Sequence, residues 1–171
     1  MKGLRVWLLR AMLIVLPALA SAQQTGIWVQ SAWSRAVMQG GVGVVYLTIV
    51  NGGGPDRLVG ATSPVAAKVE IHESFVENGV AKMRGVAALP VEPGKPLSLA
   101  PGGYHMMLMG LNQSLAQGDV FPIVLEFETA GRVAAAVTVQ AAGSSAPIHG
   151  RISGMHMEGL QNQDGTFGKA P

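Results

Sequence analysis

Cysteine is absent from this sequence of 171 residues. No disulfide can therefore form, and no thiolate is available as a nucleophile or as a metal ligand. A soft metal ion would have to be bound through the thioether sulfur of methionine, with imidazole nitrogen as a second kind of ligand. The chain contains nine methionines and four histidines. The positions of these residues are therefore the first place to look for chemistry.

Long hydrophobic runs are also missing, except near the N-terminus. Residues 1–22 contain the basic residues Lys2, Arg5 and Arg10, an apolar run from Ala11 to Leu16, and the small residues Ala20, Ser21 and Ala22. This order predicts a signal peptide that is cleaved after Ala22, because the run is too short for a stable membrane span. An uncleaved anchor is the alternative. We expect an exported protein with no stable membrane insertion after cleavage.

Excess positive charge is confined to the precursor. The whole chain has twelve basic and ten acidic residues, and three of the basic ones lie in residues 1–22. Cleavage leaves nine basic residues against ten acidic ones, which gives a formal charge of −1. Nucleic-acid binding requires clustered Lys and Arg on the folded domain. We therefore expect no nucleic-acid partner.

Helix signals are scarce, whereas short apolar or alternating runs recur between turn residues supplied by 23 Gly and ten Pro. This pattern is typical of an all-β sandwich. Removing 22 residues from 171 leaves 149, which suits one domain. We expect the domain at residues 23–141 and a flexible tail at 142–171, where large apolar residues are few. The predicted strands are 27–33, 42–51, 57–62, 66–75, 80–86, 104–109, 120–128 and 132–140.

Alternation shows how two of these strands face. Phe121, Ile123, Leu125 and Phe127 alternate with polar residues, and Val133 to Val139 continue the same period, which predicts a hairpin around residues 129–131. Residues 89–96 contain three prolines, which lack the donor that a central strand needs. We expect this segment to be a connection.

The histidines and methionines fall into two groups. One lies in the predicted domain (His72, Met83, His105 and Met107), and the other lies in the predicted tail (His149, Met155, His156 and Met157). Residues two apart on a strand share a face, so His105 and Met107 point the same way while Met106 faces the core. The same alternation turns His72 outward beside Glu70 and Lys68, and buries Val69 and Ile71.

Two imidazoles and two thioethers form a neutral ligand set that suits Cu(I) better than magnesium, calcium or manganese. Short His- and Met-rich tracts also bind metal, so the tail is a candidate for a second copper site that could hold Cu(II). Taken singly, each of these residues has a structural explanation, since methionine fills core gaps and a surface histidine is usually solvated. An inert tail is likewise an open alternative.

The spacing of the domain group resembles the copper-binding signature of the periplasmic copper chaperone family (PCuAC-type). His72, ten residues, Met83, 21 residues, His105, one residue and Met107 match it throughout. Similar flanking segments are AWSRA at 32–36, YLTIVN at 46–51, DRLVGA at 56–61 and PGGYHMMLMGL at 101–111, so the resemblance covers roughly residues 27–140. One departure is Glu73, where many relatives have methionine.

The resemblance implies a cupredoxin-like Greek-key sandwich with a Cu(I) site near its surface, and a carrier rather than an enzyme. It also implies a periplasmic location and a copper-accepting partner, such as a cytochrome oxidase copper domain or another copper chaperone. Three alternatives stay open: copper storage or buffering, a copper oxidase or reductase, and a Met-rich interaction module that does not transfer copper. Against an enzyme, the sequence has no Ser/His/Asp arrangement and no thiolate nucleophile.

Overall fold

The computed structural model describes residues 26–145. The predicted signal peptide and its cleavage position, together with the tail from residue 146 onward, lie outside these residues. All regular structure in the described part is β-strand: β1 Ile27–Arg35, β2 Gly43–Asn51, β3 Asp56–Thr62, β4 Ala66–Glu77, β5 Val80–Gly85, β6 Leu89–Val91, β7 Leu97–Leu99, β8 Tyr104–Leu111, β9 Val120–Phe127 and β10 Gly131–Gln140. The predicted all-β class is confirmed. Within residues 26–145, no helix is long and apolar enough to cross a membrane.

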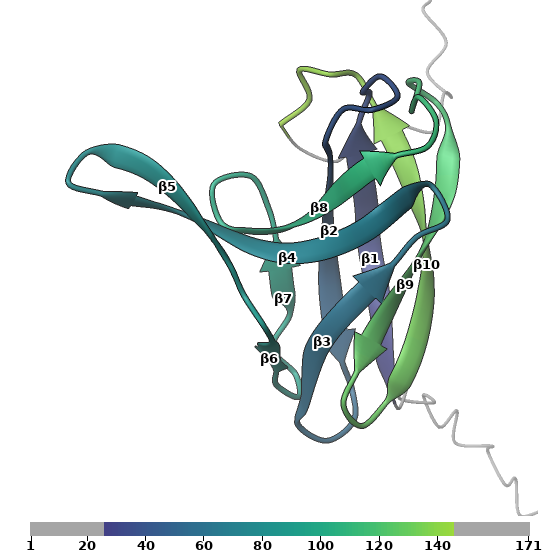
Figure 1. Cartoon of the computed structure of the whole chain (residues 1–171). Helices are drawn as coiled ribbons and strands as arrows, with labels where there is room; N and C mark the ends of the chain where they lie inside the picture. Colours follow the sequence, from purple (N-terminus) through teal and green to yellow (C-terminus); the bar gives the residue numbers. More distant parts are fainter. Residues whose placement is uncertain (1–25, 146–171) are drawn as a thin grey trace, which may run out of the picture.

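The strands form one hydrogen-bonded sheet in the order β5-β4-β8-β2-β1-β10-β9-β3-β6, and β7 pairs with β2 beside this path. β1 and β10 pair in parallel, and the other pairs are antiparallel. The sheet curls over, so that β2 and β8 lie in one layer and β9 and β3 in the other (Figure 1). This gives the sandwich a single core.

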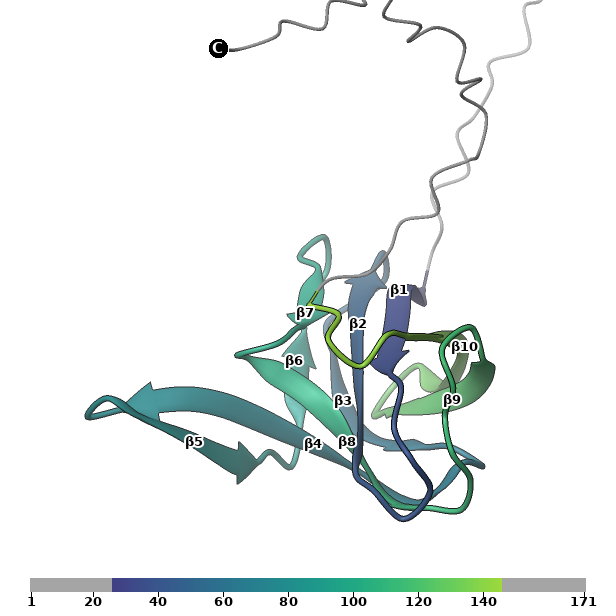
Figure 2. The same cartoon turned by 90° about the horizontal axis from the view of Figure 1, so that it is seen from above.

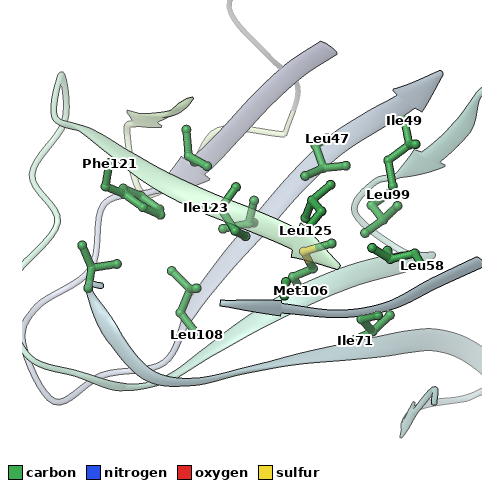
Figure 3. Packing of buried hydrophobic residues seen from close by; sticks show 14 of the residues in the cluster. Leu47, Ile49, Leu58, Ile71, Leu99, Met106, Leu108, Phe121, Ile123 and Leu125 are labelled. Carbon is green, nitrogen blue, oxygen red and sulfur yellow. The ribbon is translucent and has the colours of Figure 1, made fainter. Parts of the chain in front are cut away.

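The core is built from the inward-facing residues of both layers. Figure 3 shows Ile123 and Leu125 of β9 gathered with Leu47 of β2 and Met106 of β8, and all four side chains are almost completely buried. The predicted hairpin of β9 and β10 is confirmed by its continuous antiparallel pairing from Gly131 opposite Phe127 onward. Alternation therefore gave the correct facing in these strands.

The segment 89–96 was expected to be a connection, and this was wrong in part. Residues 89–91 form β6, and a second unpredicted strand, β7, follows at residues 97–99. Each has three residues, which is too short for a period to show in the sequence. Pro90 is tolerated because β6 pairs only with β3, at the end of the strand order. The argument against a central strand was correct.

The end of β4 and the whole of β5 project from the sandwich as a two-stranded arm, residues 74–85 (Figures 1 and 2). β4 pairs with β8 from Ala66 to Glu73 and with β5 from His72 to Glu77, so His72 lies at the root of the arm, where three strands meet. The arm closes with Asn78 and Gly79, whose φ angles of 53° and 75° are typical of a type I′ hairpin turn. Every residue of β5 is exposed.

Candidate metal centre

Strand register places the four predicted domain ligands on one face of β4, β5 and β8. His72 lies directly opposite His105, and Met107 lies opposite Glu70 in the same pair of strands. Met83 of β5 lies opposite Ser74, two residues beyond His72. Directly opposed residues, and residues two apart along a strand, share a face of the sheet. The face-sharing that the sequence predicted for His105 and Met107 is present.

His105 is held in one orientation beside Met83. Its side chain is buried, and Nδ1–H donates a hydrogen bond to the carbonyl oxygen of Gly103 at 3.0 Å. Nε2 then carries the lone pair, because a neutral imidazole has only one N–H. This atom lies 3.2 Å from the Met83 Sδ. Two electron-pair donors therefore face each other, with no proton available between them.

This separation agrees with what a bound ion requires. A tetrahedral first-row ion has bonds of about 2.0 Å to nitrogen and about 2.3 Å to sulfur, which places the two donor atoms about 3.5 Å apart. The observed 3.2 Å needs only a small opening of the arm. Met83 can supply that movement, because it lies on an exposed strand that has no neighbour beyond it in the described sheet.

His72 supplies the second imidazole of this cluster. Its ring centroid lies 6.1 Å from that of His105, and its Nε2–H donates to the Glu70 Oε2 at 3.0 Å. The other ring nitrogen, Nδ1, is buried and has no hydrogen-bond partner. His72 lies on the expected face of β4. Its side chain is only 18% exposed, however, so it has less contact with water than the sequence suggested.

Glu70 is the charged neighbour of this cluster. Its Oε1 forms an ion pair with the Lys68 Nζ at 2.6 Å, while its Oε2 accepts from His72. The hydrogen bond from Lys68, followed by that from His72, holds the pKa of Glu70 below its ordinary value. The carboxylate is therefore ionised at neutral pH. The sequence showed Glu70 on the face of His72, but the hydrogen bond depends on side-chain geometry that spacing does not reveal.

An aromatic wall lies beside His105, and the sequence did not identify it as part of the site. The Tyr46 ring lies 6.4 Å from that of His105, and Trp33 packs 4.6 Å from Tyr46. The guanidinium of Arg35 lies 5.4 Å from the centre of the Tyr46 ring, and its Nε–H donates to the carbonyl oxygen of Ser144 at 2.8 Å. This wall follows from the pairing of β2 with β8, which no local motif encodes.

The donor set excludes some ions and suits others. Among residues 26–145, no group of three or more His, Cys, Asp or Glu side chains could hold a metal ion. The cluster instead combines imidazole with thioether, which favours Cu(I) over ions that prefer oxygen. The tail residues His149, Met155, His156 and Met157 lie outside the described part of the chain.

Comparisons with known proteins identify relatives of this chain. The LpqE-like lipoprotein family model matches residues 27–139. The protein Lxx21020 of Leifsonia xyli subsp. xyli (strain CTCB07), a lipoprotein by its name, is 34% identical over 129 residues, which are 73% of this chain and 78% of that protein. The lipoprotein names of these relatives are consistent with an exported protein.

Two solved structures share the fold. The copper-bound PCuAC domain from PmoF2 is 28% identical, with a TM-score of 0.57 over 67% of this chain and 92% of that domain. The Cu(I) form of DR1885 from Deinococcus radiodurans is 30% identical, with a TM-score of 0.55 over 72% of this chain and 83% of that chain. The expected cupredoxin-like β fold is confirmed. The chain belongs to the LpqE-like, PCuAC-type family.

Proposed function

We propose that this protein carries Cu(I) in the periplasm, on His72, Met83, His105 and Met107, and delivers it to a partner protein. The observation that carries the proposal is the approach of His105 Nε2 to Met83 Sδ at 3.2 Å. The hydrogen bond from His105 to Gly103 fixes Nε2 as the free electron pair. In the absence of a metal, two such donors gain nothing from facing each other.

The relatives support copper as the cargo. One related structure is a copper-bound PCuAC domain, and another is the Cu(I) form of DR1885. The partner we propose is a cytochrome oxidase copper domain or another copper chaperone, with copper-centre assembly as the purpose. An export signal in residues 1–22 and a periplasmic location are part of the same proposal.

Transfer by ligand exchange follows from the unequal exposure of the ligands. Met83 is 51% exposed on the arm, whereas His105 is 6% exposed beneath it. An incoming thiolate or imidazole of the partner would displace the Met83 thioether first and His105 last. Two imidazoles and two thioethers carry no charge. The site can therefore hold and release a monovalent ion without burying a net negative charge.

The test of delivery is a transfer experiment under anaerobic conditions. The protein is loaded with one Cu(I), mixed with an apo cytochrome oxidase copper domain, and separated from it by ion exchange for copper analysis. We expect most of the copper on the acceptor. A variant with His105→Ala and Met107→Ala should fail to retain Cu(I) before mixing. Copper that stays on the wild-type protein would contradict delivery and favour storage or buffering.

The tail group His149, Met155, His156 and Met157 is proposed as a second copper site, which could take Cu(II). The proposal depends on composition alone: two imidazoles and two thioethers within nine residues. Truncation after Ser145 should lower the amount of bound Cu(II) by one equivalent and leave Cu(I) binding by the domain unchanged. Equal Cu(II) binding by the full and the truncated chain would contradict it.

A further inference from the structure

We propose that Glu70 is a positioning residue that fixes the proton of His72 on Nε2, so that His72 binds copper through Nδ1. The inference rests on the proposed copper site and assigns the binding atom within it. Two observations carry it: the 3.0 Å hydrogen bond from His72 Nε2 to Glu70 Oε2, and the buried Nδ1 that has no hydrogen-bond partner.

The tautomer follows from what each group can do. An ionised carboxylate only accepts hydrogen bonds, so the proton between Glu70 and His72 belongs to Nε2. Nδ1 then presents its lone pair inside the protein, where an unpaired acceptor is costly. Within residues 26–145, it is the one buried side-chain nitrogen or oxygen atom without a hydrogen-bond partner. A bound metal ion would satisfy this atom.

The Glu70 carboxylate is itself held in place. Lys68 Nζ pairs with Oε1 at 2.6 Å, which leaves Oε2 for His72. Lys68, Glu70 and His72 are spaced two residues apart along β4, so all three side chains lie on the face of the proposed site. Lys68 therefore orients the carboxylate of Glu70, and Glu70 orients the imidazole of His72. Partners of this kind commonly set the orientation of metal-binding histidines.

The two histidines then use different nitrogens. His105 donates its Nδ1–H to the carbonyl oxygen of Gly103 and offers Nε2, whereas His72 donates Nε2–H to Glu70 and offers Nδ1. A backbone carbonyl fixes the first tautomer and cannot be removed by mutation. The second depends on a side chain, which makes it testable.

The experiment uses ¹⁵N-labelled protein and long-range ¹H–¹⁵N correlation spectra of the histidine rings. In the metal-free protein we expect His72 to carry its proton on Nε2 and His105 on Nδ1. Anaerobic addition of Cu(I) should then shift His72 Nδ1 and His105 Nε2. In Glu70→Ala, the His72 ring should become a mixture of tautomers, and Cu(I) affinity should fall about 10–100-fold.

Two variants separate positioning from general structural damage. Glu70→Gln keeps an oxygen that can accept from His72, so it should restore the Nε2–H tautomer and most of the affinity. Glu73→Ala removes the adjacent carboxylate on the opposite face of β4, which pairs with Arg84 at 2.6 Å, and should change neither quantity. Thermal unfolding of all the variants shows whether they are equally folded.

The possible failures are distinguishable. If Cu(I) shifts no histidine nitrogen in the wild-type protein, the proposed function fails, and the inference fails with it. If Cu(I) shifts His105 Nε2 together with His72 Nε2, the copper site stands and the role of Glu70 is overturned. A Glu70→Ala variant that keeps the wild-type tautomer and affinity would also overturn it.

Discussion

Replacement of Met83 by leucine separates copper binding from stability. Leucine has nearly the volume of methionine, and such exchanges cost less than about 1.5 kcal/mol even in a core. Met83 is half exposed on a strand that is exposed at every residue, so the cost here should lie well below that value. The substitution removes the sulfur that lies 3.2 Å from His105 Nε2. Copper binding should therefore weaken while the fold remains.

The expected loss of affinity can be bounded from below. Losing a partner that only orients a metal ligand costs about 10–100-fold, so losing a ligand itself should cost at least about 100-fold, or roughly 2.7 kcal/mol. Anaerobic competition with a chromogenic Cu(I) chelator measures the affinity, and thermal unfolding of the metal-free protein measures the stability. Both measurements are made on the same preparation of Met83→Leu.

Met38→Leu is the matched control. Met38 is 77% exposed in the loop between β1 and β2, and Gly40 of this loop hydrogen bonds to the carbonyl oxygen of Leu111. Leu111 ends β8, roughly 13 Å along the strand from Met107 and roughly 20 Å from His105, so this methionine lies outside the proposed site. We expect Met38→Leu to bind Cu(I) as the wild type does. Equal affinities for Met83→Leu and Met38→Leu would refute the reasoning.

Two further predictions concern stability. Asp56 accepts hydrogen bonds from the backbone N–H groups of Arg57, Thr129 and Ala130, so Asp56→Ala should lower the free energy of unfolding by about 2–3 kcal/mol in urea titrations. Burial raises the pKa of Asp56, but the three N–H donors outweigh burial, and the net shift of the pKa is downward. The stabilisation by Asp56 is therefore present above the unfolded-state pKa of about 3.9, and it is lost as the pH falls through the lower folded-state pKa. The difference between wild type and Asp56→Ala should therefore shrink in acid, and a constant difference would contradict the assignment. Leu125→Ala, in a completely buried position, should cost about 2–5 kcal/mol, and a loss below 1 kcal/mol would contradict the packing described for the core.

Much of the fold could be predicted because alternation is a local signal. Phe121, Ile123, Leu125 and Phe127 alternate so regularly that the facing of β9 can be read directly from the sequence, and all four are buried. β6 and β7 carry no such signal, because three residues contain no period. Their pairing is decided by distant strands, β3 and β2, which the local sequence does not specify.

The proposed site also combines features that could be predicted from the sequence with features that could not. That His105 and Met107 share a face is a local consequence of strand geometry and could be predicted. That His105 lies directly opposite His72 depends on the register between β4 and β8, which long-range pairing sets. For this contact the family resemblance carried the prediction, since residue spacing alone left a structural explanation open. The hydrogen bond from His72 to Glu70 depends on side-chain geometry, which the spacing of residues does not specify.

The proposed site combines a rigid half with a movable half, and this division suits a carrier. β8 lies between β4 and β2, and Met106 and Leu108 anchor it in the core, so His105 has little freedom. Met83 lies on β5 at the end of the strand order, where one strand alone holds it. Movement of the arm can therefore lengthen the contact from Met83 to the ion without disturbing the buried histidine. A copper site enclosed on every side by the core would hold its ion more tightly, but it would offer a partner no ligand to displace first.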